Sequence, residues 1–166
     1  MASSTVVKVR KDGLITLSDG AAATYTVAYE DGDFTADTLT GGNAADRIVI
    51  KDRGQIVGLR KGDDAVGALS FSVHFREFTN GSASALLDFI TGTNAGAALT
   101  STGGSGFEQF LCGVNMTIEG TDHGDTADAS VQWTKVLLTA SMAEGDPDKL
   151  SITGETYVAP TFTGQA

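Results

Sequence analysis

Apolar and polar residues alternate with a period of two along most of this chain, and that pattern predicts β-strands. The clearest run spans residues 69–76, where Leu, Phe, Val and Phe alternate with Ser, Ser, His and Arg. Similar runs cover residues 109–119, 130–142 and 150–157. In the run 130–142 the apolar set shifts register between Trp133 and Val136, which predicts a bulge in a long strand.

Turn residues divide these runs into hairpins. Asp12-Gly13 and Asp31-Gly32-Asp33 each separate two short apolar runs, so we expect two hairpins to open the domain. Asp52-Arg53-Gly54 separates residues 48–50 from 56–59 and predicts either a short hairpin or an extended loop with strand-like arms. Residues 144–148 include Pro147 and predict a tight turn between the last two strands.

A single segment, Ala83 to Thr91, has helical periodicity. Ser82 or Ser84 can cap its start and Gly92 can end it. A helix this short depends on packing for stability. The apolar face expected to supply that packing consists of Leu86, Phe89 and Ile90. The Gly-, Ala-, Ser- and Thr-rich segment Thr93 to Gly106 predicts a flexible loop.

The chain length and composition indicate one domain, residues 1–166. The 21 glycines and two prolines favour a turn-rich, mainly β fold: an antiparallel sandwich or barrel with one short flanking helix and long loops. The lone Cys112 lies on an apolar strand face and is expected to be a buried thiol. We see neither a signal peptide nor an apolar run of membrane-spanning length, and therefore expect synthesis in a cytoplasm without membrane association.

Charge is unevenly distributed along the sequence. The net charge is −10, yet the segment Arg47 to Lys61 holds five of the 11 basic residues and one acid, so it carries 5 − 1 = +4 and the remainder −14. The five basic residues are Arg47, Lys51, Arg53, Arg60 and Lys61. Such a segment is suited to lie against an acidic surface, including that of another copy of the chain.

Candidate metal sites are weak. Residues 37–48 resemble one turn of a calcium β-roll, but only one copy is present. The acids at 122, 125 and 128 lack the spacing of an EF-hand. His74 and His123 have no Cys or His partner at ligand spacing. We therefore expect no metal site.

Catalytic motifs are equally weak. Ser105 misses the G-x-S-x-G elbow by one position, and the surrounding glycines lack the lysine of a phosphate-binding loop. Asn80 and Asn115 match glycosylation sequons, which carry little meaning without a secretion signal. We expect no catalytic residues, no cofactor and no enzyme activity.

The order of elements resembles the major tail tube proteins of long-tailed bacteriophages. The resemblance spans about residues 6–160: the passage Asp52 to Asp64 leads into an alternating strand, a short helix, a closing strand, the turn 144–148 and a final strand. It is one of pattern rather than of an invariant signature. In that family six copies form a ring, rings stack into a hollow tube, and DNA passes through. Related subunits build contractile-phage tubes and the inner tube of type VI secretion.

The resemblance implies a virion protein of the phage tail that assembles with itself as stacked homohexameric rings. It also implies tape measure, tail terminator and distal tail proteins as partners, with DNA passing without specific binding. The five basic residues above are then expected to form the ring-stacking interface. Acidic segments at 30–37, 119–128 and 144–148 are candidate receivers. The residues that line the lumen are not indicated.

Two other classes fit the sequence. A capsid-decorating or scaffold protein would also be acidic, Gly-rich and without catalytic residues. A β-sandwich carbohydrate-binding or adhesive module usually exposes aromatic side chains, but aromatic residues make up only 7% of this chain and mostly occupy alternating core positions. Both alternatives predict isolated globules where the tail tube interpretation predicts rings or tubes.

Overall fold

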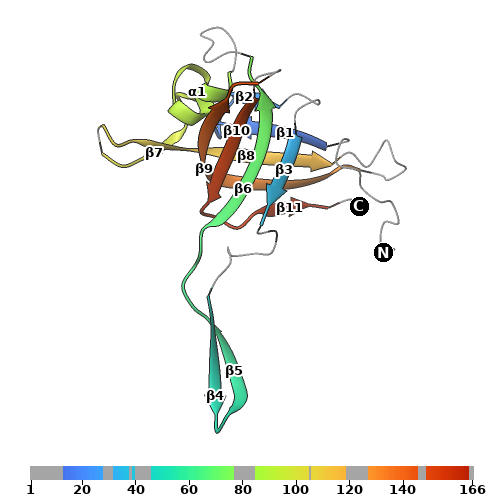
Figure 1. Cartoon of the computed structure of the whole chain (residues 1–166), viewed down its shortest axis with the longest axis vertical. Helices are drawn as coiled ribbons and strands as arrows, with labels where there is room; N and C mark the ends of the chain where they lie inside the picture. Colours follow the sequence, from blue (N-terminus) through green and yellow to red (C-terminus); the bar gives the residue numbers. More distant parts are fainter. Residues whose placement is uncertain are drawn as a thin grey trace.

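Nine of the described strands form one antiparallel sheet, and two more form a separate hairpin (Figure 1). The computed structural model describes residues 13–27, 32–37, 39, 46–76, 85–104, 106–118, 127–145 and 149–164. The main path of the sheet is β2-β1-β8-β9-β10-β6-β3, with β7 paired to β8 and β11 paired to β9. The mainly β, antiparallel fold expected from the alternation is confirmed.

The sheet folds into two layers joined by one long strand. The first layer contains β1 (Gly13–Ser18), β2 (Thr24–Thr26), β7 (Thr100–Thr102) and β8 (Gln109–Ile118). The second contains β3 (Gly32–Ala36), β6 (Gly67–His74) and β10 (Lys149–Thr156). Strand β9 (Ala129–Ala143) belongs to both, and the short β11 (Thr161–Thr163) pairs with its first half.

The predicted bulge in β9 is confirmed. Cys112 pairs with Val136, whereas Val114 pairs with Trp133, so β9 has one more residue than β8 between these two pairs. The bulge places Trp133, Val136 and Leu138 all in the core. Residues 129–137 of β9 pair with β8 and residues 136–143 pair with β10, which is how one strand serves both layers.

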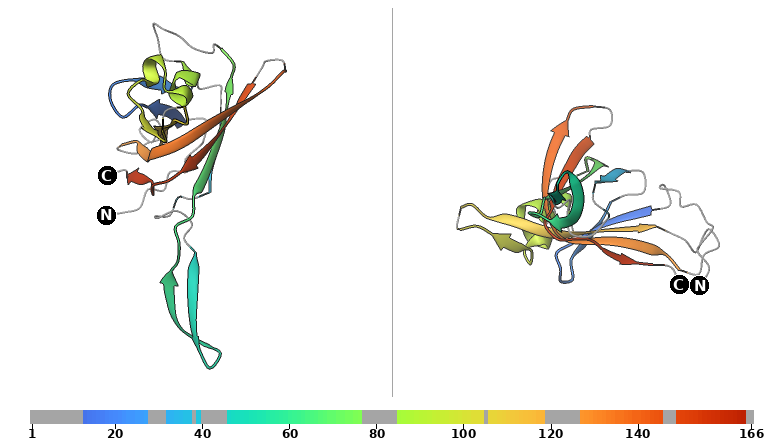
Figure 2. Two further views of the ribbon diagram at one scale, coloured as in Figure 1. Left: turned by 90° about the vertical axis from the view of Figure 1, so that its left-hand side faces the viewer. Right: turned by 90° about the horizontal axis from the view of Figure 1, so that it is seen from below.

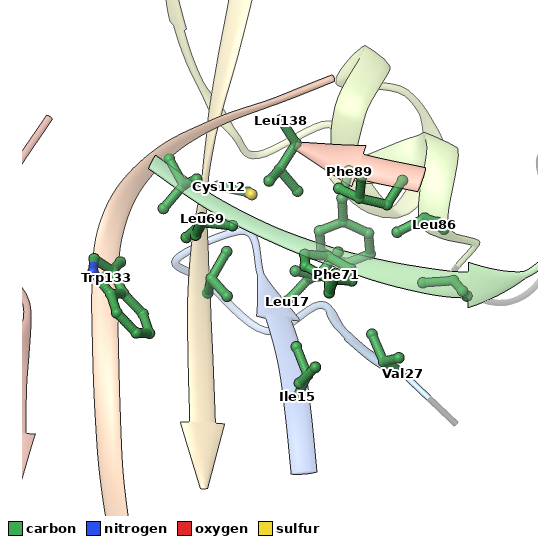
Figure 3. Close-up of a cluster of buried hydrophobic side chains, with 14 of the residues drawn as sticks. Ile15, Leu17, Val27, Leu69, Phe71, Leu86, Phe89, Cys112, Trp133 and Leu138 are labelled. Atoms are coloured by element: carbon green, nitrogen blue, oxygen red, sulfur yellow. The ribbon is translucent and has the colours of Figure 1, made fainter. Parts of the chain in front are cut away.

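The core lies between the two layers (Figure 3). It brings together alternating side chains of β1, β6, β8, β9 and β10, so the inward faces predicted from the sequence are confirmed. Cys112 is fully buried, as expected. The largest wholly buried side chains are Trp133, Phe89, Leu17 and Ile152.

Helix α1 (Leu86–Thr91) covers one end of the core, where Leu86 and Phe89 are buried and Ile90 packs against the core cluster. It starts later than predicted. Its N-cap is Ala85, and the Asp88 carboxylate accepts a hydrogen bond from the Ala85 N–H at 3.3 Å. The serine cap expected at Ser82 or Ser84 was therefore wrong, because an acid inside the first turn performs the capping.

Residues 93–104 contain regular structure, although the composition of the segment 93–106 predicts a flexible loop. They contain a short 3-10 helix, η2 (Asn94–Gly96), and strand β7, which pairs with β8. Asp88 organises the start of this segment, because its Oδ1 accepts hydrogen bonds from Asn94 at 3.0 Å and Thr93 at 3.2 Å. Local hydrogen bonds and the burial of Leu99 thus order a segment poor in apolar residues.

The predicted hairpin around Asp31-Gly32-Asp33 was also wrong. Its two arms fall in β2 and β3, which lie at opposite ends of the main sheet path and pair with β1 and β6. The hairpin predicted at Asp12-Gly13 and the turn predicted around Pro147 lie outside the described residues.

Candidate assembly surface

A two-stranded hairpin projects from the two-layered body, and we call it the arm. It consists of β4 (Arg47–Asp52) and β5 (Gln55–Lys61), which form a sheet of their own. Two views show it extending along the long axis of the molecule, away from the body (Figures 1 and 2). Of the two forms that the sequence left open, the hairpin is the one observed.

The tip of the arm is a tight two-residue turn. Arg53 and Gly54 both have positive φ, 46° and 85°. Positive φ at both central residues defines the type I′ turn, whose twist matches that of the strands on either side. Arg53 therefore occupies the outermost part of the molecule along this axis, in a backbone conformation that few side chains adopt readily.

The strand register determines which side chains share a face of the arm, because directly opposed residues of an antiparallel pair point the same way. One face combines the opposed pairs Arg47–Lys61, Val49–Leu59 and Lys51–Ile56. The other face combines Ile48 with Arg60 and Ile50 with Gly58. Each face is therefore part aliphatic and part basic.

The aliphatic side chains of the arm are exposed. Ile56, Leu59 and Val57 have exposed fractions of 69%, 64% and 61%, and three residues of β4 are also exposed: Ile48, Val49 and Ile50. A two-stranded hairpin is at best marginally stable in water on its own. A contiguous apolar surface of this kind usually marks an interaction site.

The five predicted interface residues, Arg47, Lys51, Arg53, Arg60 and Lys61, are brought together on the arm, and all are exposed. Arg47 and Lys61 are directly opposite each other across the two strands. Like charges in such a position repel. Lys61 also forms an ion pair with Asp64, which offsets part of this repulsion.

The base of the arm is acidic, in contrast to its strands. Asp46, Asp63 and Asp64 are exposed there and together contribute −3; we call them the acidic root. The two chain segments of the root are joined by backbone hydrogen bonds, Asp46 N to Asp63 O at 2.9 Å and Gly62 N to Asp46 O at 2.5 Å. The charge thus changes sign along the arm, from negative at the root to positive in the strands.

Neither the acidic root nor the aliphatic part of the interface was predicted from the sequence. The contiguous apolar residues 48–50 and 56–57 carried a signal, but such runs are also typical of buried strands. Of the predicted acidic receivers, 119–128 and 144–148 lie largely outside the described residues, whereas residues 32–37 of the segment 30–37 are described and include β3. The three root acids flank the basic segment directly and could have been found from that spacing.

A second projection is formed by the β7–β8 hairpin, which extends sideways from the body (Figures 1 and 2). Phe107 near its tip is 84% exposed. The turn is fixed by hydrogen bonds from Phe107 N to Gly104 O at 2.9 Å and from Gly106 N to Glu108 Oε2 at 2.8 Å. Phe107 is the most exposed large apolar side chain in the part of the chain that the structure describes.

The open face of β3, β6, β9 and β10 contains a shallow cavity of about 480 Å³. Small side chains of the central strand β6, Ala68 and Ser70, form its floor. Its walls include the hydroxyls of Thr35, Thr139 and Thr153, and the acids Asp37 and Glu155 stand at one end. Thr35 and Ser70 share a hydrogen bond of 2.7 Å between their hydroxyl oxygens.

Metal-ligating side chains are not gathered into groups among the described residues. No cluster of three or more His, Cys, Asp or Glu side chains there is placed to hold a metal ion. Burial raises the pKa of the Cys112 thiol to about 12, so the thiolate needed for nucleophilic chemistry is suppressed. His123, Ser105, Asn80 and most of the calcium-roll-like segment lie outside the described residues. None of the described helices is long and apolar enough to cross a membrane.

Solved structures of contractile injection assemblies share this fold. A chain in the cryo-EM structure of the anti-feeding prophage cap, the AFP tube terminating cap, matches with a TM-score of 0.60 and 14% identity over 100% of this chain and 96% of that chain. A chain of the PVC sheath/tube terminator in the extended state matches with a TM-score of 0.59 and 11% identity, covering 98% of this chain and 100% of that chain.

A chain of the PVC sheath-tube complex in the extended state matches with a TM-score of 0.58 and 11% identity, covering 98% of this chain and 99% of that chain. No protein-family model and no curated protein sequence match the chain. At these identities the likeness is one of fold, and it extends over the whole length of the chain. The fold is therefore of the kind found in tube and tube-terminator assemblies of contractile injection systems.

Proposed function

We propose that this protein is a structural subunit of a tail-like tube, assembling with itself as hexameric rings that stack. The observation that carries the proposal is the arm, which exposes six aliphatic and five basic side chains along the long axis of a tail-tube-like fold. Exposure of the aliphatic side chains to water costs free energy, and docking of the arm on a neighbouring ring would remove that cost. A repeated contact between two different surfaces of the same chain generates a tube.

The open face of β3, β6, β9 and β10 is our candidate for the wall of the lumen. The hydroxyls of Thr35, Thr139 and Thr153 line its cavity. Asp37 and Glu155 at one end repel phosphate, while Lys149 is exposed at the other end of β10 on the same face. A wall lined mainly by basic side chains would instead bind the backbone of DNA strongly. The proposed tube is then a conduit through which DNA passes without specific binding, in a phage tail made in a bacterial cytoplasm.

Partners beyond the chain itself follow from the same proposal. A tube of this kind needs a protein that sets its length and proteins that close its two ends, which correspond to tape measure, tail terminator and distal tail proteins. We assign this chain no catalytic role, in keeping with the suppressed thiolate of Cys112.

A terminator of the tube is the second candidate, because two of the matched structures are named for a terminating cap and a sheath/tube terminator. A tube subunit polymerises on its own, whereas a terminator forms single rings that end a tube made of another protein. Both roles use the same fold and differ in whether rings of this chain stack on each other.

Analytical ultracentrifugation over rising concentration, followed by negative-stain microscopy, tests the proposal. Stacked rings support the tube subunit, and isolated hexameric rings support the terminator. A 17.1 kDa monomer that persists at high concentration without rings would contradict both and favour a capsid-decorating or adhesive module.

A further inference from the structure

We propose that successive copies contact each other through their arms, with the basic tip of one arm docked on the acidic root of the next. This inference rests on the proposed function and names the receiving surface of the stacking contact. The occupant is a second copy of the same chain. Charge complementarity within a single arm is the observation that selects it.

The two ends of the arm are complementary in charge. At the tip, Lys51 and Arg53 are exposed beside one acid, Asp52. At the root, three exposed acids are gathered within two short segments held together by backbone hydrogen bonds, beside the opposed pair Arg47 and Lys61, so the root end carries −3 + 2 = −1 and the tip 2 − 1 = +1. Only Asp64 of these is paired with a basic side chain of its own arm, Lys61, among the ion pairs of the described residues. Opposite charges at the two ends of one element favour a head-to-tail contact.

The length of the arm fits a contact of this kind. The seven residues of β5 run between the tip and the root of the arm and span about 23 Å. The eight residues of β6, which measure the height of the second layer, span about 26 Å. The distance from root to tip is therefore close to the height of the second layer, so an arm that descends along the body below it ends near the level at which the next arm begins.

The symmetry of a stack places the tip of one arm and the root of the next arm at positions that allow contact. Copies in a stack of identical rings carry their arms at the same radius, because stacking repeats one geometry. The tip of one arm then arrives near the root of another without a separate receptor on the body. The aliphatic faces of the arm, including Ile56 and Leu59, would be covered along the way by the lower copy.

A charge-exchange experiment tests the contact. The tip variant combines Lys51→Glu with Arg53→Asp, because Asp accepts a positive φ better than most side chains. The root variant combines Asp46→Lys with Asp63→Lys, which spares the Lys61–Asp64 ion pair. A fourth protein carries all four changes. The matched control is Lys135→Glu with Lys149→Glu, two exposed basic residues on the body.

Assembly is measured as the pelletable fraction and as tube length by microscopy, and circular dichroism checks folding. We expect the pelletable fraction of the tip variant and of the root variant to fall at least about tenfold. The variant with all four changes should regain assembly, since its tips and roots are again opposite in charge. The control variant should assemble like wild type. We also expect wild-type stacking to weaken from 0.15 M to 1 M salt, as the screening length falls from about 8 Å to about 3 Å.

Two results would overturn the inference while leaving the proposed function intact. One is a tip variant that forms tubes as long as those of wild type. The other is loss of assembly in both variants without recovery when they are combined, since this would place the charges against other surfaces. Absence of rings from the wild-type protein itself would instead contradict the proposed function.

Discussion

Phe34 and Trp133 pack against each other with ring centroids 5.5 Å apart and ring planes at 46°, although their strands are not neighbours in the sheet. Two strands, β10 and β6, separate β9 from β3 along the sheet path. The contact can form only because the sheet folds over on itself. This aromatic pair therefore joins the two layers, from the half of β9 that pairs with β8 to β3 at the far edge of the second layer.

Replacing Phe34 with Ala should destabilise the fold by about 2 to 4 kcal/mol, because the ring is half-buried against Trp133 and Phe71. Urea unfolding can be followed by the fluorescence of Trp133, the single tryptophan of the chain. Phe162→Ala, at an exposed position of β11, is the control and should cost less than about 1 kcal/mol. Equal losses from the two variants would argue against a closing role for Phe34.

Gly92 is expected to resist substitution by Ala. Its φ is +66°, and an added Cβ would lie 2.4 Å from the ring of Phe110. The left-handed conformation costs about 1–2 kcal/mol for a residue with a Cβ, and overpacking adds about 1–3 kcal/mol. Thermal unfolding should show a clear loss for Gly92→Ala and almost none for Gly104→Ala, where nothing lies within 4 Å. A neutral Gly92→Ala would mean that the helix end can shift away from β8.

Burial of Cys112 makes the free energy of unfolding depend on pH in the alkaline range. Its pKa is raised from 9.0 to about 12 in the folded chain, so the neutral thiol is favoured by folding. The unfolded chain releases this proton above about pH 9. Its contribution to stability is therefore fully present below pH 9 and is lost as pH rises toward 12. Unfolding measured from pH 8 to pH 11 should show a steeper decline for wild type than for Cys112→Ala, and matching slopes would contradict this.

Removal of the arm should leave the body folded. The arm forms its own two-stranded sheet, and the Asp46 N to Asp63 O hydrogen bond of 2.9 Å holds its two ends together. Joining Asp46 to Gly62 through an Asn-Gly turn should change unfolding free energy by less than about 1 kcal/mol. The same variant should form no tubes. Loss of cooperative unfolding would show that the arm supports the body as well.

Most of the fold could be predicted from the sequence because burial of alternate side chains leaves a local signal. The strands around Phe71, Cys112 and Ile152 appear in the sequence as they do in the structure. The bulge between Trp133 and Val136 was also visible, since an extra residue must shift the apolar set. These features depend on neighbours along the chain.

Strand partners were not predictable in the same way. Asp31-Gly32-Asp33 has the residues of a hairpin turn, yet β2 and β3 end at opposite edges of the main sheet path, because packing in the core outweighs a local turn preference. The cap of α1 was not predicted either, since Asp88 performs the capping in place of the expected serine. For the candidate site, the five basic residues were identified, but their grouping with exposed aliphatic side chains and the acidic root required the hairpin register.

Five residues, 62–66, connect the arm to β6, and this connection determines how the molecule responds to mechanical load. Strand β6 lies between β10 and β3, and its register with β10 is unbroken from Gly67 to His74. A pull on the arm along its axis therefore loads the hydrogen bonds on both sides of β6 together, in shear, instead of opening them one at a time. Tension applied at the tip near Arg53 is thus shared between β6 and the two strands that pair with it, β10 and β3.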